Sequence, residues 1–223
     1  MKKTITIIAI LLLGLSTVFA QKQKSGFSFQ FAGILPFAQF DNTPALVIPG
    51  TNSFHEAGGA MFGASFGIKY TYSFEKTSIE DLGLGIFFSV DAMWNALQKD
   101  IRIKYDNVNC TKPMYINAPV MIGVSYTSQF SDVFGVWAEA GIGADLFYKT
   151  AEGWEKNMTN YRMNVEFAAE GGAGIILART VTLGAHYYWL GNHDVRAKNE
   201  NALISTPNPL KVGVWAFKLG FHF

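Results

Sequence analysis

Few residues of this chain could ligate a metal or act in nucleophilic catalysis. None of the four histidines stands at a metal-ligand spacing from another histidine or from the single cysteine, so the sequence predicts no zinc site. No serine pairs with His186 at a spacing typical of a hydrolase family, and His193 and Asp194 are expected in a loop. We therefore expect no catalytic residues and no metal ligands. The histidines are His55, His186, His193 and His222, and the cysteine is Cys110.

Glycine-rich runs such as GLGIFF, GIGAD and GGAGI superficially resemble nucleotide-binding loops. They lie within strand-like patterns, have no adjoining Lys-Ser or Lys-Thr pair and are not followed by a helical pattern, so phosphate binding is not indicated. The formal net charge of +1 does not indicate the basic surface that nucleic-acid binding requires. The sequence therefore predicts no cofactor and no nucleic-acid partner.

Charged side chains inside otherwise apolar and glycine-rich runs form a more informative group. Counting from the strand ends places Lys69, Glu139 and Lys218 at similar heights, with Glu170 a little above them. Buried charges must pair, because an unpaired ion in a low-dielectric interior is strongly unfavourable. We predict an ionic plug in which Glu139 couples to Lys218, and a narrow gated ion path is the alternative. The predicted lumen charge cluster comprises Lys69, Glu139, Glu170, Lys218, Asp91 and Glu166, with Asp91, Asp145 and Glu166 expected above the plug.

The elements that must position these residues are strands, because apolar and small residues alternate with period two in eight runs. In the run 60–72, Ala60, Phe62 and Phe66 share the apolar face, opposite Met61 and Gly63. Most runs approach or exceed the ~10 residues with which a tilted strand crosses a bilayer. The pattern predicts an all-β fold, an eight-stranded antiparallel up-and-down transmembrane β-barrel. The runs are 27–32, 60–72, 82–94, 116–126, 134–148, 164–177, 181–189 and 215–223.

The connections between these runs alternate in length. Residues 41–58, 95–112, 149–161 and 191–209 are long and polar, whereas 74–81, 127–133 and 178–180 are short. In a membrane barrel the long loops are extracellular and the short turns periplasmic, so both termini are expected in the periplasm.

A soluble barrel of the lipocalin type also alternates, and composition separates the two possibilities. Only 16% of the residues are charged and 49% are hydrophobic, whereas about 25% charged residues is usual for soluble domains. The face opposite the apolar one is glycine and serine with few charges, which gives no coat for water. Aromatic residues also gather at the strand ends, as expected at membrane interfaces. The predicted aromatic girdle contains Tyr70, Tyr72, Trp94, Tyr126, Tyr148 and Trp189.

The first 20 residues are typical of a secretory signal peptide. Lys2 and Lys3 precede an apolar stretch from Ile5 to Leu15, and Val18-Phe19-Ala20 provides small residues for cleavage before Gln21. We therefore divide the chain into a signal peptide, 1–20, and a barrel domain, 21–223. Within the barrel domain Cys110 has no possible disulfide partner in the chain.

Three stretches resemble the outer membrane protein beta-barrel domain family, which includes small porin-like eight-stranded barrels of the OmpA and OmpX type. MYINAPVMIGVSY followed by FGVWAEAGIGADLFYKT resembles the family's Tyr-x-x-x-Pro strand and glycine-rich hairpin, although Asn117 stands where an acidic residue is common. AHYYWLGNHD is similar to its penultimate strand. The terminal KVGVWAFKLGFHF resembles the strand that barrel-assembly machinery reads, with Phe221 and Phe223 as the assembly signal.

The resemblance implies an outer-membrane location in a Gram-negative bacterium, with membrane lipid and the barrel-assembly machinery as partners. It does not imply an activity. The first functional hypothesis is a non-enzymatic structural or surface protein whose four long loops contact an extracellular ligand. The second is a small channel or a transport or secretion accessory, and the third is a lipid-modifying outer-membrane enzyme.

Overall fold

The computed structural model describes residues 25–42, 46–47, 54–55, 58–74, 82–97, 114–150, 163–193 and 209–223. The predicted signal peptide, Cys110 and Asp194 lie outside the described residues.

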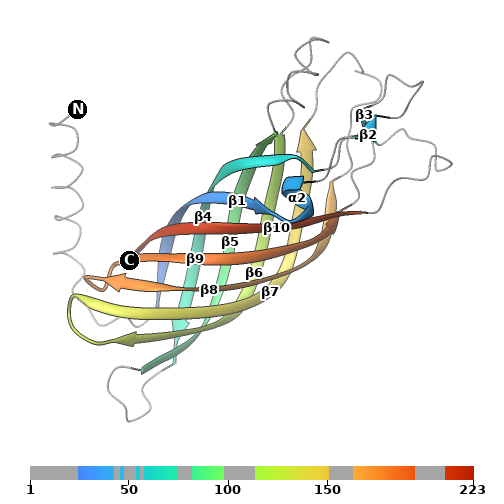
Figure 1. The fold of residues 1–223 in the computed structure, drawn as a ribbon. Coiled ribbons are helices and arrows are strands. Elements are labelled where there is room, and N and C mark those ends of the chain that lie inside the picture. The colour runs from blue at the N-terminus through green and yellow to red at the C-terminus, as the bar shows by residue number, and fades with distance from the viewer. Residues whose placement is uncertain are drawn as a thin grey trace, which may run out of the picture.

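Eight antiparallel strands close into a barrel in the order β1-β10-β9-β8-β7-β6-β5-β4, and β1 pairs with both β10 and β4 (Figure 1). Strands that follow one another along the chain are neighbours in the sheet, so the predicted fold class, an all-β up-and-down barrel, is confirmed. The barrel strands are β1 (Gly26–Phe37), β4 (Ala60–Ser73), β5 (Leu82–Leu97), β6 (Met114–Gln129), β7 (Phe134–Thr150), β8 (Asn164–Leu177), β9 (Val181–His193) and β10 (Leu210–His222).

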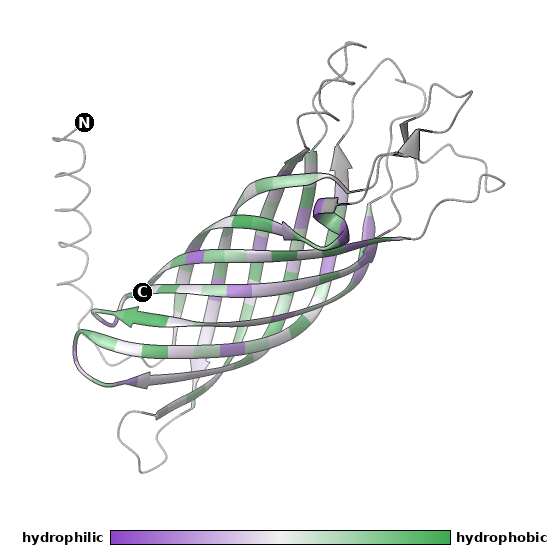
Figure 2. Cartoon of the chain, in the orientation of Figure 1, coloured by the Kyte–Doolittle hydropathy of each residue, from purple (hydrophilic) through white to green (hydrophobic). Residues whose placement is uncertain are grey.

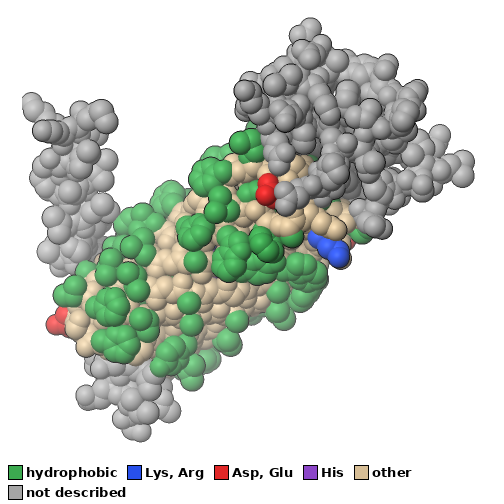
Figure 3. Space-filling view, in the orientation of Figure 1, with side chains coloured by type: hydrophobic (Ala, Val, Ile, Leu, Met, Phe, Trp, Pro, Cys, Tyr) green, Lys and Arg blue, Asp and Glu red, His purple; other side chains and the backbone are tan. Residues whose placement is uncertain are grey.

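Alternation along each strand separates an apolar outer face from a small or polar inner face. In β1, Phe27, Phe29 and Phe31 are exposed, whereas Ser28 and Gln30 are buried in the lumen. Hydrophobic and less hydrophobic residues alternate along the strands (Figure 2). Hydrophobic side chains are spread over the visible exterior of the barrel, and charged side chains on that face lie towards its two ends (Figure 3). An exterior of this kind buries its apolar surface only in lipid.

Glycines on the inner face make room for the large side chains that fill the lumen. A Cβ on Gly184 would lie 2.2 Å from Trp137 Cζ2, and one on Gly172 would lie 2.6 Å from His186 Nδ1. Four bulky aromatic side chains are buried in the lumen among these small residues. They are Phe87, Trp137, Phe147 and Tyr188.

A β-bulge near the start of β4 corrects the prediction for Ala60 and Met61. The register of β4 against β5 shifts between Ala60 and Gly63, so one extra residue reverses the alternation. Ala60 is therefore fully buried in the lumen, whereas Met61 faces outward.

A second bulge moves His193 into the lumen, so its predicted position in a loop is wrong. The register between β9 and β10 shifts between Lys211 and Gly213, and Gly191 adopts a φ of +90°. A positive φ is accessible to glycine at little cost, and the extra residue it accommodates turns the next side chains inward. β9 consequently continues to His193, which is completely buried.

Tight turns join β6 to β7 and β8 to β9 at the end where both described termini lie (Figure 1). In the turn 178–180, Ala178 and Arg179 have φ values of +49° and +63°, consistent with the two positive values of a type I′ hairpin. Ser131 Oγ accepts hydrogen bonds from the backbone N–H groups of Val133 and Phe134 in the neighbouring turn. The Arg179 guanidinium pairs with Asp132, which links the two turns.

At the other end, the first described element of the connection after β1 packs against β1, β4 and β10. This connection contains the short helix α2 (Gln39–Asn42) and a two-stranded sheet, β2 (Leu46–Val47) with β3 (Phe54–His55). The Phe40 ring of α2 is completely buried and lies edge-on against Tyr115, with ring centroids 5.1 Å apart. The connection predicted for residues 41–58 therefore starts within a helix that begins at Gln39 and that the sequence pattern does not indicate.

Among the described residues, no helix is long and apolar enough to span a membrane.

Candidate functional site

The lumen contains an ionic layer formed by side chains from different strands. We define it as Lys69 (β4), Asp91 (β5), Glu139 (β7), Lys218 (β10) and the Glu170 (β8) and His186 (β9) pair beside them. Lys69 Nζ donates to Glu139 Oε2 at 2.7 Å, and the two side chains are only 9% and 4% exposed. Because neither group can be hydrated fully at this depth, the contact between them is what makes their burial tolerable.

Lys218 pairs with Asp91, which corrects two predictions. Its Nζ lies 3.1 and 3.0 Å from the two Asp91 carboxylate oxygens and 2.9 Å from Gln30 Oε1. Asp91 is thus a member of the ionic layer and does not lie above it, and Lys69, rather than Lys218, is the partner of Glu139. The tilt and stagger of the strands determine which side chains meet across a barrel, and the number of residues from a strand end does not reveal either.

Tyr188 extends the same network. Its hydroxyl donates to Asp91 Oδ2 at 3.2 Å, and Lys218 Nζ lies 5.1 Å from the centre of its ring. Lys69 is similarly placed near two aromatic rings, 5.6 Å from Trp137 and 5.7 Å from Phe87. Both ammonium groups therefore combine a carboxylate partner with cation–π contacts, which further stabilise a desolvated cation.

Glu170 and His186 are brought next to Glu139. His186 Nδ1 lies 3.5 Å from Glu139 Oε1 and 3.7 Å from Glu170 Oε2, and the His186 and Glu170 side chains are each 1% exposed. Three potential ligand atoms, one from each residue, lie within 4.8 Å of one another. Spacing along the chain gives no sign of this group, because the three residues are on consecutive strands and meet only through the barrel register.

A mouth layer closes the lumen above the ionic layer. It is formed by Phe40, Tyr115, Phe147 and His193, with Asp145 beside His193. The Phe147 ring stacks on His193 with centroids 4.5 Å apart and lies 5.7 Å from Tyr115. The Tyr115 hydroxyl donates to Gly58 O at 2.8 Å and accepts from Gly58 N–H at 3.1 Å. This residue therefore ties the connection after β1 to the barrel wall.

His193 and Asp145 form a second polar pair, at the mouth. His193 Nε2 lies 3.1 Å from Asp145 Oδ2 and 2.6 Å from Leu190 O, and both side chains are fully buried. Glu166 is opposite Asp145 in the β7–β8 register and is only half-buried. Within the described part of the chain, no contact joins Glu166 to Lys69 or Lys218, so the structure does not bring this member of the predicted cluster into the ionic layer.

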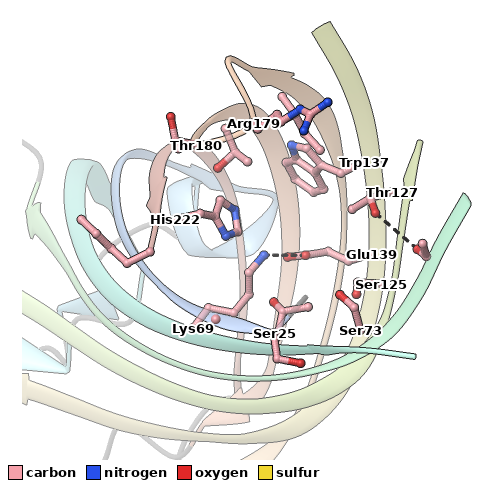
Figure 4. A pocket seen from close by; sticks show the side chains of 16 residues that line it. Ser25, Lys69, Ser73, Ser125, Thr127, Trp137, Glu139, Arg179, Thr180 and His222 are labelled. Atoms are coloured by element: carbon pink, nitrogen blue, oxygen red, sulfur yellow. Dashed lines mark hydrogen bonds and ion pairs between the residues drawn. The ribbon is translucent and has the colours of Figure 1, made fainter. Parts of the chain in front are cut away.

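Below the ionic layer, a polar vestibule opens towards the end of the barrel with the tight turns (Figure 4). Its volume is about 210 Å³, and Ser125, Thr127, Arg179 and His222 are among the residues that line it. The Lys69–Glu139 pair points into this vestibule and forms its inner boundary (Figure 4). The lumen is consequently accessible from one end as far as the ionic layer.

The aromatic residues proposed for the girdle lie at the two rims. Tyr70, Tyr72 and Tyr126 lie near the turn end, and Trp94 and Trp189 lie near the mouth; all five are exposed, and Tyr148 is half-buried. At the chain terminus, Phe223 is exposed and its ring lies edge-on against Phe29, with centroids 5.7 Å apart, whereas Phe221 is half-buried.

An apolar belt around a closed eight-stranded barrel, with its lumen filled by side chains, defines the class of small membrane-spanning β-barrels. Comparisons with solved structures give three examples of similar architecture. The chain is 15% identical to Ail, the attachment invasion locus protein of Yersinia pestis, with a TM-score of 0.41, covering 89% of this chain and 97% of that one. It is 13% identical to the outer membrane enzyme PagL (TM-score 0.42; 89% and 98% covered) and 13% identical to OprG from Pseudomonas aeruginosa (0.45; 90% and 97%). No family model matches the chain, and no curated protein does.

These similarities do not indicate an activity, because they are remote and the proteins differ in kind: one is an attachment protein, one an enzyme. The assignment to the barrel class rests on the strand pairing and surface of this chain itself.

Proposed function

We propose that this protein is a non-enzymatic barrel of the bacterial outer membrane, with a closed lumen, that holds its long connections at the cell surface to contact an extracellular ligand. The observation that carries the proposal is the filling of the lumen by two successive layers. The Lys69–Glu139 and Lys218–Asp91 pairs bridge it at one level, and Tyr115 and Phe147 fill it at the next. A lumen filled by side chains in this way favours a rigid barrel over a channel through which solutes pass.

The exterior supports the proposed location. A lipid-facing apolar belt with aromatic rims fits a bilayer, and bacterial barrels with this architecture occur in the outer membrane. Export by a cleaved signal peptide before residue 21 is part of the same proposal.

The absence of enzymatic activity is proposed from where the polar groups lie. Among the described residues, His186 and His193 are buried inside the barrel, and His222 lines the vestibule. Their ring nitrogens are engaged or enclosed in the lumen, where an acyl chain held in the surrounding membrane could not reach them. Analysis of outer-membrane lipids in a deletion strain tests this, and a changed acyl pattern restored by the wild-type gene would favour the enzyme.

A second candidate, a small channel or transport accessory, is favoured by the vestibule. The vestibule extends to the Lys69–Glu139 pair, so displacement of the ionic layer and the mouth layer would complete a path. This function requires both layers to move, whereas the proposed function requires neither to do so.

Surface labelling tests the orientation on which the proposed function depends. Cysteines placed at Gly153 or Asn201, positions in the long connections that lie outside the described residues, should react with an impermeant thiol reagent on intact cells. Cys110 must first be replaced by serine, since it lies in another of these connections. Labelling at Lys76 with protection of the other two positions would invert the orientation and contradict the proposal.

The terminal aromatic tests the proposed recognition by the barrel-assembly machinery. Phe223→Asp places a carboxylate on the lipid-facing rim and removes the ring contact with Phe29, so we expect much less heat-modifiable barrel in outer-membrane fractions. Phe223→Leu, which keeps an apolar side chain, is the matched control and should retain more. Equal amounts of folded Phe223→Asp and wild-type protein would remove this role from Phe223.

A further inference from the structure

The lumen carries more negative than positive charge. Among the strand residues that face the lumen and whose side chains the structure describes, two lysines stand against five carboxylates, a formal charge of −3 with neutral histidines. Two of the carboxylates, Asp91 and Glu139, are matched by Lys218 and Lys69. The surplus is carried by Glu170, Asp145 and Glu166. A group of positive charge is the ordinary way to compensate carboxylates that are kept from water.

Glu170 is the member of this surplus that lies beside the ionic layer, and among the described residues no lysine or arginine pairs with it. Its side chain is 1% exposed, and neither carboxylate oxygen accepts a hydrogen bond. The Tyr188 hydroxyl has a single proton, which it donates to Asp91 Oδ2 at 3.2 Å. His186 Nδ1, also enclosed and without a hydrogen bond, points at the same place. Buried polar groups in proteins usually have a partner, so a site that satisfies both the imidazole and the carboxylate is worth testing.

The spacing of the three groups suits a tetrahedral metal ion. Zinc bound at about 2.0–2.1 Å in a tetrahedral site places neighbouring ligand atoms about 3.4 Å apart. His186 Nδ1 lies 3.5 Å from Glu139 Oε1 and 3.7 Å from Glu170 Oε2, and all three atoms lie within 4.8 Å of one another. Lys69 binds Glu139 through its other oxygen, Oε2, so Oε1 is left for a metal.

We propose that Glu139, Glu170 and His186 form a binding site for a divalent transition-metal cation of the zinc type inside the barrel. One imidazole and two carboxylates are a donor set that zinc accepts, and three protein ligands leave a fourth position for water. The vestibule reaches Glu139 and provides an entry from the turn end of the barrel. A bound dication lowers the formal lumen charge from −3 to −1 and ties β7, β8 and β9 together. The proposal does not depend on the function proposed above.

Gly172 and Gly141 shape the site around its ligands. A Cβ on Gly172 would lie 2.6 Å from His186 Nδ1, and one on Gly141 would lie 3.3 Å from Glu170 Oε1. Alanine at position 172 would therefore displace the imidazole nitrogen that faces the carboxylates. This gives a variant that perturbs the site without removing a ligand.

The test uses the full barrel purified from outer membranes in detergent, stripped with a chelator and titrated with zinc chloride. We expect about one zinc ion per chain, no comparable binding of magnesium, and at least a tenfold loss of zinc affinity in Glu170→Gln and in His186→Phe. Glu166→Gln is the matched control, because it removes a lumen-facing carboxylate outside the group, and it should bind as the wild type does. Heat modifiability on a gel reports whether each variant is folded.

Two further measurements test the proposal even if a ligand variant fails to fold. Cobalt added to the stripped wild type should give the intense visible absorption of a tetrahedral site, and zinc should raise the urea midpoint of the wild type but not that of Gly172→Ala. Folded wild-type protein that binds no zinc, or binding that is equal in Glu166→Gln and Glu170→Gln, would overturn the proposal and leave a proton as the compensating charge.

Discussion

Removing one partner of the Lys69–Glu139 pair should cost much more stability than removing both. At an effective dielectric constant of about 20, unit charges separated by the observed 2.7 Å attract by about 6 kcal/mol, and desolvation of the two ions offsets much of this. Breaking a buried pair typically costs about 3–5 kcal/mol. Glu139→Gln keeps an acceptor for the Lys69 ammonium, so we expect the lower end, about 3 kcal/mol. Adding Lys69→Met removes the stranded charge and should recover about 2 kcal/mol.

The assay is urea unfolding of each barrel in lipid vesicles, followed by tryptophan fluorescence, as a double-mutant cycle. The control cycle combines Glu139→Gln with Lys218→Met, and it should show weaker coupling because Lys218 pairs with Asp91. Additive effects for Glu139 and Lys69, or stronger coupling to Lys218, would refute the pairing described for the ionic layer.

Two other predictions concern packing. Gly184→Ala places a Cβ 2.2 Å from Trp137 and should destabilise the barrel by about 1–3 kcal/mol in the same urea assay. The control is Gly171→Ala, which should change stability little because the nearest atom to its Cβ is 4.0 Å away. Equal effects of the two substitutions would contradict the described lumen packing. Tyr115→Phe removes both hydrogen bonds to Gly58 and should cost about 1–3 kcal/mol while speeding hydrogen exchange of the Gly58 amide; an unchanged exchange rate would show that Tyr115 does not hold this connection.

The barrel architecture could be predicted from sequence because lipid on one side and a narrow lumen on the other impose period two along every strand. Phe27, Phe29 and Phe31 show the pattern directly, and all three face outward. The pattern fails where one residue is inserted. Nothing in the alternation near Ala60 or Gly191 identifies a bulge, although the glycine at the second position is a weak signal.

The candidate site was less predictable, because it depends on register between strands that are distant in the sequence. The sequence identified Lys69, Glu139 and Lys218 as lumen charges, but the predicted Glu139–Lys218 pair is wrong. Glu139 pairs with Lys69, and Lys218 pairs with Asp91. The position of His186 beside Glu139 and Glu170 follows from the strand register, which local spacing does not encode.

Phe40, Tyr115 and Gln30 were missed for different reasons. Phe40 follows the end of a strand and enters the lumen through a short helix, and Tyr115 gains its role from a hydrogen bond to a connection that is distant in sequence. Gln30 carries no charge and does not stand out among the polar residues of the sequence, although its amide oxygen accepts a hydrogen bond from Lys218.

The closed lumen is tested most directly by electrical recording of the folded wild-type barrel in planar lipid bilayers. An established porin reconstituted in the same way serves as the positive control. Heat modifiability of the protein sample used for the recording verifies that the barrel is folded. Because the ionic layer and the mouth layer fill the lumen in succession, we predict no steady conductance steps from the wild-type protein. Reproducible steps from folded wild-type barrels would contradict a closed lumen and favour the channel.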